Sequence, residues 1–143
     1  MAVGIARLVR RALLVKLKAN AGLIALVPAA SINPAGEPVW PFILLSSPVT
    51  QRLRATGVVG GIVTYDVHAF AGPVLTGGAI TQTAEDHASA IGAAIETSLA
   101  DNNLTLEGGG NARIRLGDIR LLPDQDPQHW HWFAQCDCRV IAA

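Results

Sequence analysis

The sequence predicts a single α+β domain over residues 1–143, with a mostly antiparallel β-sheet and two main helices packed on one side of it. Three observations lead to this class. The chain has 143 residues, which is the size of one ordinary domain. Its segments of regular hydrophobic periodicity follow one another in the order helix, two strands, helix, two strands. No internal repeat or low-complexity tract divides the chain.

The first helix is predicted over residues 3–19. Its apolar residues recur at helical spacing and form one stripe, made of Ile5, Leu8, Val9, Ala12 and Leu13. Arg7, Arg11 and Lys18 fall on the opposite side. Four prolines within residues 28–41 then predict an irregular connection.

Two strands are predicted next, a short apolar one at residues 42–45 and a longer one at residues 58–70. Within the longer segment, Val63, Tyr65, Val67 and Ala69 alternate with polar Thr64, Asp66 and His68, the period of a half-buried strand. Gly60 and Gly61 near its start predict a bulge or a bend.

The segments after these strands are predicted to be loops. Residues 46–57 are read as an exposed loop, and residues 71–80 as a loop punctuated by glycine and proline. The second loop displays three apolar side chains, Val74, Leu75 and Ile80. We expect both loops to contact neighbouring proteins.

The second helix starts at a capping box formed by Thr83 and Asp86. Apolar residues then recur at helical spacing as Ala84, Ala88, Ile91, Ile95 and Leu99. Residues 101–103 end the run, and the alanines of this helix allow close packing on a sheet.

The last two strands are predicted at residues 113–122 and 129–141. Apolar residues of the first switch from even to odd numbers, so we expect a β-bulge at Gly117 or Asp118. The second has one predicted core face that consists of Trp130, Trp132, Ala134, Cys136, Cys138 and Val140. Two cysteines cannot form a disulfide framework, and this pair is read as small buried residues of a reducing compartment.

Composition favours an assembled protein. Hydrophobic residues make up 50% of the chain and charged residues 15%, and the mean hydropathy is +0.36. This balance excludes intrinsic disorder. It is also more apolar than is usual for a small monomer, which predicts surface buried against other copies or partners.

Charge is balanced in total and uneven in placement. Residues 1–54 carry seven basic side chains and one acidic side chain, a net charge of +6. Residues 55–143 carry four basic and ten acidic side chains, a net charge of −6. This asymmetry predicts a head-to-tail contact between copies, although it is also compatible with ordinary solvated surface. The candidate interface residues are Arg7, Arg10, Arg11, Arg52, Arg54, Val74 and Leu75. Arg7, Arg10 and Arg11 are expected to meet acidic residues of an adjacent copy.

The sequence lacks the motifs of most classes of enzyme and binding protein. The glycine-rich segments lack the context of phosphate loops, no serine sits in a nucleophile elbow, and no carboxylate pair is evident. No stretch reaches the roughly 18–20 apolar residues of a membrane span. The basic first helix lacks aromatic stacking groups and any nucleic-acid motif. We therefore expect no enzyme activity, cofactor or specific DNA binding.

One alternative stays open. His129 and His131 share a strand face, and Asp66 and His68 share the polar face of another strand. If these strands are neighbours, three imidazoles and a carboxylate can converge as a zinc site requires, which would favour a small metal-dependent enzyme or ligand-binding domain.

The order and spacing of segments resemble a known family. They run from ARLVRRALLVKLKANAGLIALV through WPFILL, IVTYDVHAF and AEDHASAIGAAIETSLADNNLTLEGG to RIRLGDIRLLPDQDPQHWHWFAQCDCRVIA. Over most of its length the chain is similar to the tail completion or tail terminator proteins of long-tailed bacteriophages and phage-like gene-transfer particles.

This resemblance implies a structural protein that forms a ring, usually of six copies, at the head-proximal end of the virion tail. Such a ring ends polymerisation of the tail tube protein and docks the head–tail connector or stopper protein, and DNA passes through its lumen without being held. Assembly would take place in the host cytoplasm, with no catalytic, cofactor or metal residues to carry over. Another connector subunit, such as a stopper, would share composition and fold.

Overall fold

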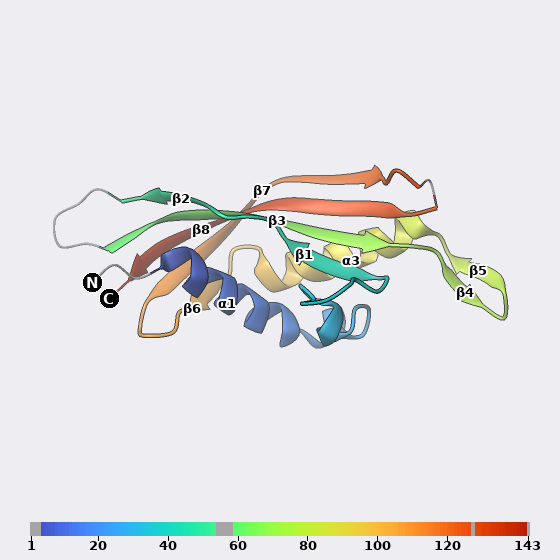
Figure 1. Cartoon of the computed structure of the whole chain (residues 1–143), viewed down its shortest axis with the longest axis horizontal. Helices are drawn as coiled ribbons and strands as arrows, with labels where there is room; N and C mark the ends of the chain where they lie inside the picture. The colour runs from blue at the N-terminus through green and yellow to red at the C-terminus, as the bar shows by residue number, and fades with distance from the viewer. Residues whose placement is uncertain (1–3, 54–58, 127, 143) are drawn as a thin grey trace.

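The computed structural model describes residues 4–53, 59–126 and 128–142 (Figure 1). Its helical segments are α1 (Ile5–Lys18), α2 (Ala21–Ile24), the 3-10 turn η1 (Ala29–Ser31) and α3 (Ala84–Leu99). Its strands are β1 (Phe42–Leu45), β2 (Val49–Arg52), β3 (Val59–Ala71), β4 (Val74–Thr76), β5 (Ala79–Gln82), β6 (Asn103–Thr105), β7 (Asn111–Pro123) and β8 (Trp130–Ala142).

The main sheet has the order β1-β3-β8-β7-β6, and β2 also pairs with β3. All of these strand pairs are antiparallel. β3 and β8 pair along 13 residues each, from Val59 opposite Ala142 to Ala71 opposite Trp130. The prediction of an α+β domain with a mostly antiparallel sheet is confirmed.

The helices cover one face of this sheet, with α1 and α3 as the two main elements (Figure 1). The core lies between them and the sheet. α1 buries Ile5, Val9, Leu13 and Leu17. The odd-numbered residues of β3 from position 61 onward and the even-numbered residues of β8 from 132 to 140 are buried against the helices, as the alternation predicts. The Tyr65 hydroxyl donates a 2.8 Å hydrogen bond to the Ala6 carbonyl, which ties α1 to β3.

Close packing of α3 depends on a glycine. A Cβ atom added at Gly92 would overlap the indole ring of Trp132 on β8. Trp132 is 4% exposed, so its ring has no open space to move into. Absence of a side chain at Gly92 thus lets the helix lie directly on the tryptophan.

The structure confirms the predicted start of the second helix and the predicted β-bulge. The Thr83 hydroxyl accepts a hydrogen bond from the Asp86 N–H at 3.2 Å and caps α3. The pairing of β7 with β8 shifts between Leu116 and Ile119, which is the bulge predicted at Gly117 or Asp118.

Both predicted loops contain strands, so those predictions are wrong in part. Within residues 46–57, β2 pairs with β3 from Val49 opposite Thr64 to Arg52 opposite Gly61. The bulge expected at Gly60 and Gly61 is also wrong, because β3 keeps its register with β8 there. Gly61 instead permits a close approach, since an added Cβ would overlap the Gln51 carbonyl oxygen.

Residues 74–82 form the β4–β5 hairpin rather than an irregular loop. Thr76 pairs with Ala79 across a turn in which Gly77 and Gly78 have φ values of +61° and +84°. Two consecutive positive φ angles are typical of tight hairpin turns and favour glycine. The hairpin extends beyond one end of the main sheet (Figure 1).

Candidate interaction surfaces

The face of the sheet opposite the helices carries an arginine patch near one end, which we define as Arg113, Arg115 and Arg139. Strand register aligns Gln51, Ile62, Arg139 and Arg113 in one row across β2, β3, β8 and β7. Arg115 lies in the next row, opposite Asp137. Because side chains alternate between faces, residues of one row share the outer face.

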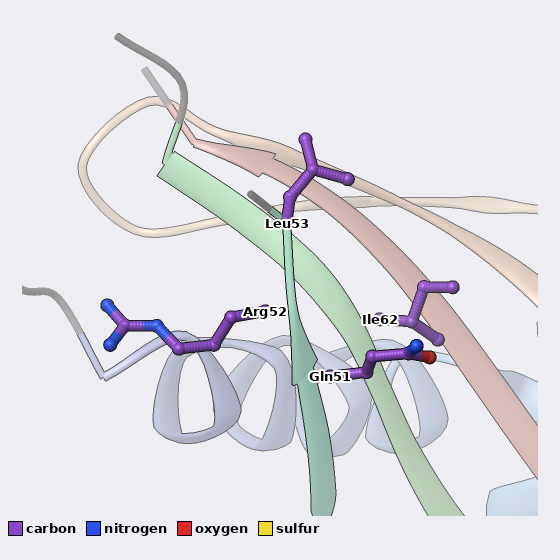
Figure 2. Close-up of a pocket in the computed structure, with 4 residues that line it drawn as sticks. All are labelled: Gln51, Arg52, Leu53 and Ile62. Atoms are coloured by element: carbon purple, nitrogen blue, oxygen red, sulfur yellow. The ribbon is translucent and has the colours of Figure 1, made fainter. Parts of the chain in front are cut away.

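Two hollows lie on this end of the sheet and share Ile62. One, of about 480 Å³, is lined by the arginine patch together with Ile62 and Asp137. The other, of about 900 Å³, is lined by Gln51, Arg52, Leu53 and Ile62. In Figure 2, Gln51 lies beside Ile62, whereas Arg52 leaves β2 on the opposite side.

Among the residues that the structure describes, no arginine of the patch forms an ion pair, although Asp137 lines the same hollow. Asp137 Oδ1 accepts hydrogen bonds from Thr64 Oγ1 at 2.7 Å and from Gln135 Nε2 at 3.3 Å. Ion pairs among residues 4–53, 59–126 and 128–142 join Arg11 to Glu107 and His129 to Asp126, and neither includes the patch. An anionic partner surface would therefore find these guanidinium groups available.

The other end of the outer face carries a ring cluster, defined as Trp40, Phe42, His68, Phe70, His129, His131 and Phe133. Trp40 stacks on His129 with ring centroids 4.1 Å apart, and Phe70 stacks on His131 at 4.3 Å. His68 Nδ1 lies 2.7 Å from His131 Nε2, so one imidazole donates a hydrogen bond to the other. Trp40 is 42% exposed at the edge of the cluster.

The hypothesis of a site with three imidazoles is wrong in its geometry. β3 and β8 are neighbours and bring His68 and His131 together, as that hypothesis required. His129 instead stacks on Trp40, and its Nδ1 lies 3.1 Å from Asp126. Across the ranges that the structure describes, no three His, Cys, Asp or Glu residues are grouped so as to hold a metal ion.

The histidine pair predicts a pH dependence of stability. Burial lowers the pKa of His68 and of His131; the neighbouring His68 lowers that of His131 further, while Asp66 and Asp124 oppose these shifts. Between the lowered pKa and the ordinary value of about 6.5, the unfolded chain binds more protons than the folded one. We therefore expect the free energy of unfolding to fall as the pH drops from about 7 to 5.

Urea unfolding at several pH values measures this dependence. In the double variant His68→Asn/His131→Gln, the slope between about pH 7 and 5 should become smaller, because the two titrating groups are gone. Equal slopes in the variant and the wild type would contradict the prediction.

The β4–β5 hairpin presents two apolar side chains to solvent. Leu75 and Ile80 face each other across the strands and are 59% and 64% exposed. Val74, the other predicted contact residue, is half-buried at the base of the hairpin. Exposure of paired large apolar side chains on a projecting hairpin is typical of a contact surface.

Four acidic residues lie at the same end of the sheet as this hairpin. α3 begins next to it, and the His87 imidazole hydrogen-bonds the Gly72 carbonyl at 2.9 Å. Glu85 and Asp86 lie in the first turn of α3, and Asp124 and Asp126 lie in the β7–β8 turn at the same end of the sheet. Residues 71–90 and 121–131 contain no lysine or arginine.

Other candidate interface residues occupy separate places. Arg7 and Arg10 are exposed on α1, while Arg11 forms a 2.9 Å ion pair with Glu107 of its own chain. Arg52 lies at the end of β2, and Arg54 falls outside the described residues. Whether any of them contacts an adjacent copy stays a prediction.

Sequence reasoning missed the arginine patch. Dividing charge between two halves of the chain hid it, because all four basic residues beyond position 54 lie in β7 and β8, and three of them form the patch. Their positions were readable as the solvent face of the two predicted strands, but only the pairing of β7 with β8 brings them together.

The cysteine pair lies in the core. Cys136 and Cys138 are buried free thiols with sulfur atoms 3.8 Å apart. The hydrogen bond to Cys138, reinforced by burial, raises the pKa of the Cys136 thiol well above its usual range. A thiol held in its protonated form is a poor nucleophile and metal ligand.

No helix in the described part of the chain is both long and apolar enough to cross a bilayer.

Comparison with known proteins identifies a family and a solved structure of similar fold. The model of the family described as "Tail completion protein gp17" matches residues 11–141. A chain from the structure titled "Virion of native gene transfer agent (GTA) particle" superposes with a TM-score of 0.78 at 15% sequence identity. The match covers 99% of this chain and 100% of that one, so the two share a fold. No curated protein sequence gives a match.

Proposed function

Because the chain belongs to the tail completion protein gp17 family, a family of structural virion tail proteins, we propose that it forms a ring at the head-proximal end of a phage-type tail. The ring ends polymerisation of the tail tube and provides the docking surface for the head–tail connector. The family match over residues 11–141 is the observation that carries this proposal.

Surface chemistry supports a role in assembly. The exposed apolar residues of the chain gather on projecting or edge elements, such as Leu75 and Ile80 on the hairpin and Val49 on β2. The arginine patch and the acidic residues near the hairpin lie at opposite ends of the sheet. Such separated surfaces suit a subunit that contacts copies of itself and two different neighbours.

Ending a polymer requires one face that matches the last tube ring and another that does not repeat the tube surface. In this proposal the first half of α1, with exposed Arg7 and Arg10, and the end of β2, with Arg52, serve contacts between subunits or along the tail axis, whereas the last turn of α1 takes no part. Val74 and Leu75 serve the same purpose on the hairpin. DNA passes through the lumen without specific binding.

Deleting the gene tests the proposal. We expect particles without this protein to show overlong tails that lack heads, because nothing stops tube growth or joins the tube to the connector. Electron micrographs of the particles measure tail length directly, and expression of the wild-type chain from a plasmid provides the control. Tails of normal length in the deletion would contradict a role in termination.

A further inference from the structure

Charge in the folded molecule is separated along the sheet rather than between the two halves of the sequence. The arginine patch lies where β3 begins and β8 ends, since Arg139 pairs with Ile62. Glu85, Asp86, Asp124 and Asp126 lie where β3 ends and β8 begins, beside Ala71 and Trp130. The molecule thus has a basic end and an acidic end.

The basic end combines positive charge with apolar surface. Beside the arginine patch lie Ile62, Leu53 and Val49, of which the last two are 39% and 69% exposed. Ile62 lines both hollows, so they adjoin each other on β2, β3, β8 and β7, and we call the two hollows together the groove. The lining is apolar on the side of β2 and β3 and basic on the side of β8 and β7, so a segment that carries apolar residues next to acidic ones would match it.

The acidic end has that composition. Leu75 and Ile80 project on the β4–β5 hairpin, Glu85 and Asp86 lie at its base, and Asp124 and Asp126 lie in the β7–β8 turn at the same end of the sheet. Gly77 and Gly78 form the turn of the hairpin. A Cβ atom added at either glycine would meet no other atom within 4 Å. The hairpin is therefore narrow at its tip and free of its own chain.

We propose that the β4–β5 hairpin and the acidic residues at its base dock into the arginine-lined groove at the basic end of a second copy of the chain. This inference rests on the proposed ring and names the surfaces that close it. Both surfaces belong to one chain and lie at opposite ends of it, so the same contact repeats from copy to copy. A repeated head-to-tail contact closes into a ring when the rotation between copies permits.

Charge reversal in two variants tests the contact by sedimentation velocity of the full chain. The first variant is Arg113→Glu/Arg139→Glu, and the second is Glu85→Lys/Asp86→Lys. Each alone should weaken self-association on the order of tenfold or more, since like charges would face each other. An equimolar mixture of the two should regain assembly, because each reversed end then meets an opposite charge. Wild-type assembly should weaken as salt rises from about 50 to 500 mM.

Lys16→Glu/Lys18→Glu on α1 is the matched control, because it changes the net charge as much as the first variant does and lies away from the groove. Its self-association should stay within about twofold of the wild type. Equal weakening by the control and the first variant, or no regain in the mixture, would overturn the contact. So would a wild-type chain that stays monomeric at millimolar concentration in low salt.

Two further outcomes separate this contact from other uses of the groove. Variant rings that form normally and fail only to join the tube would assign the groove to another tail component and overturn the contact between copies. Salt-sensitive binding of a 30-base-pair DNA duplex that Arg113→Glu/Arg139→Glu abolishes, with rings intact, would overturn it in favour of nucleic acid. Intact charge-dependent rings together with normal tail length in the gene deletion would refute termination and leave the contact standing.

Discussion

Replacing Gly92 by alanine is expected to lower the free energy of unfolding by about 1–3 kcal/mol, the usual cost of overpacking a core. In an exposed helix the same change gains about 1 kcal/mol, because alanine is the better helix former. Here the new Cβ would overlap the Trp132 indole, and that ring is buried between α3 and β8. The overlap therefore has to be relieved by moving the helix away from the sheet.

Urea unfolding of a double-mutant cycle checks this prediction. The variants are Gly92→Ala, Trp132→Leu and the combination of the two. In the Trp132→Leu background the ring is absent, so Gly92→Ala should be neutral or stabilising, with an interaction energy of about 1–3 kcal/mol. An alanine that costs the same in both backgrounds would contradict the contact between Gly92 and Trp132.

Replacing Leu13 by alanine is expected to cost about 3 kcal/mol, within the range measured for buried leucines. Leu13 is 0% exposed in the middle of α1 and packs with the core formed by α3 and the sheet. Removing its side chain leaves a cavity that the surrounding helices and strands fill only in part. The loss should weaken attachment of α1, and with it the position of Arg7 and Arg10.

The matched control lies two residues further along the same helix. Val15 is 69% exposed, so Val15→Ala should change the free energy of unfolding by about 0.5 kcal/mol or less. Urea unfolding of both variants compares the two faces of α1 directly. Similar costs for Leu13→Ala and Val15→Ala would show that α1 does not pack as the structure has it.

Local patterns of apolar and polar residues predicted much of the fold. The alternation of side chains along β8 predicted that Trp132, Cys136 and Cys138 share the buried face, where the structure has them. The switch of phase between Leu116 and Ile119 located the bulge. These features depend on residues close together in the chain, and so the sequence alone reveals them.

Local sequence patterns predicted less about the candidate surfaces. β2 has no apolar alternation, and pairing with β3 decides its structure. His129 belonged to the proposed imidazole group by its place on a strand face, yet stacking on Trp40 from a distant segment turns it aside. Contacts between residues far apart in sequence determine both outcomes.

What the sequence by itself determined is the class of the domain, the buried face of each main element and the resemblance to tail completion proteins. Only the tertiary structure decided which charged and apolar side chains share a surface. Arg113 and Arg139 are 26 positions apart and become neighbours through the pairing of β7 with β8. Periodicity fixes the direction in which a side chain points from its own strand, whereas strand order fixes its neighbours, and that order is set by packing of the whole chain.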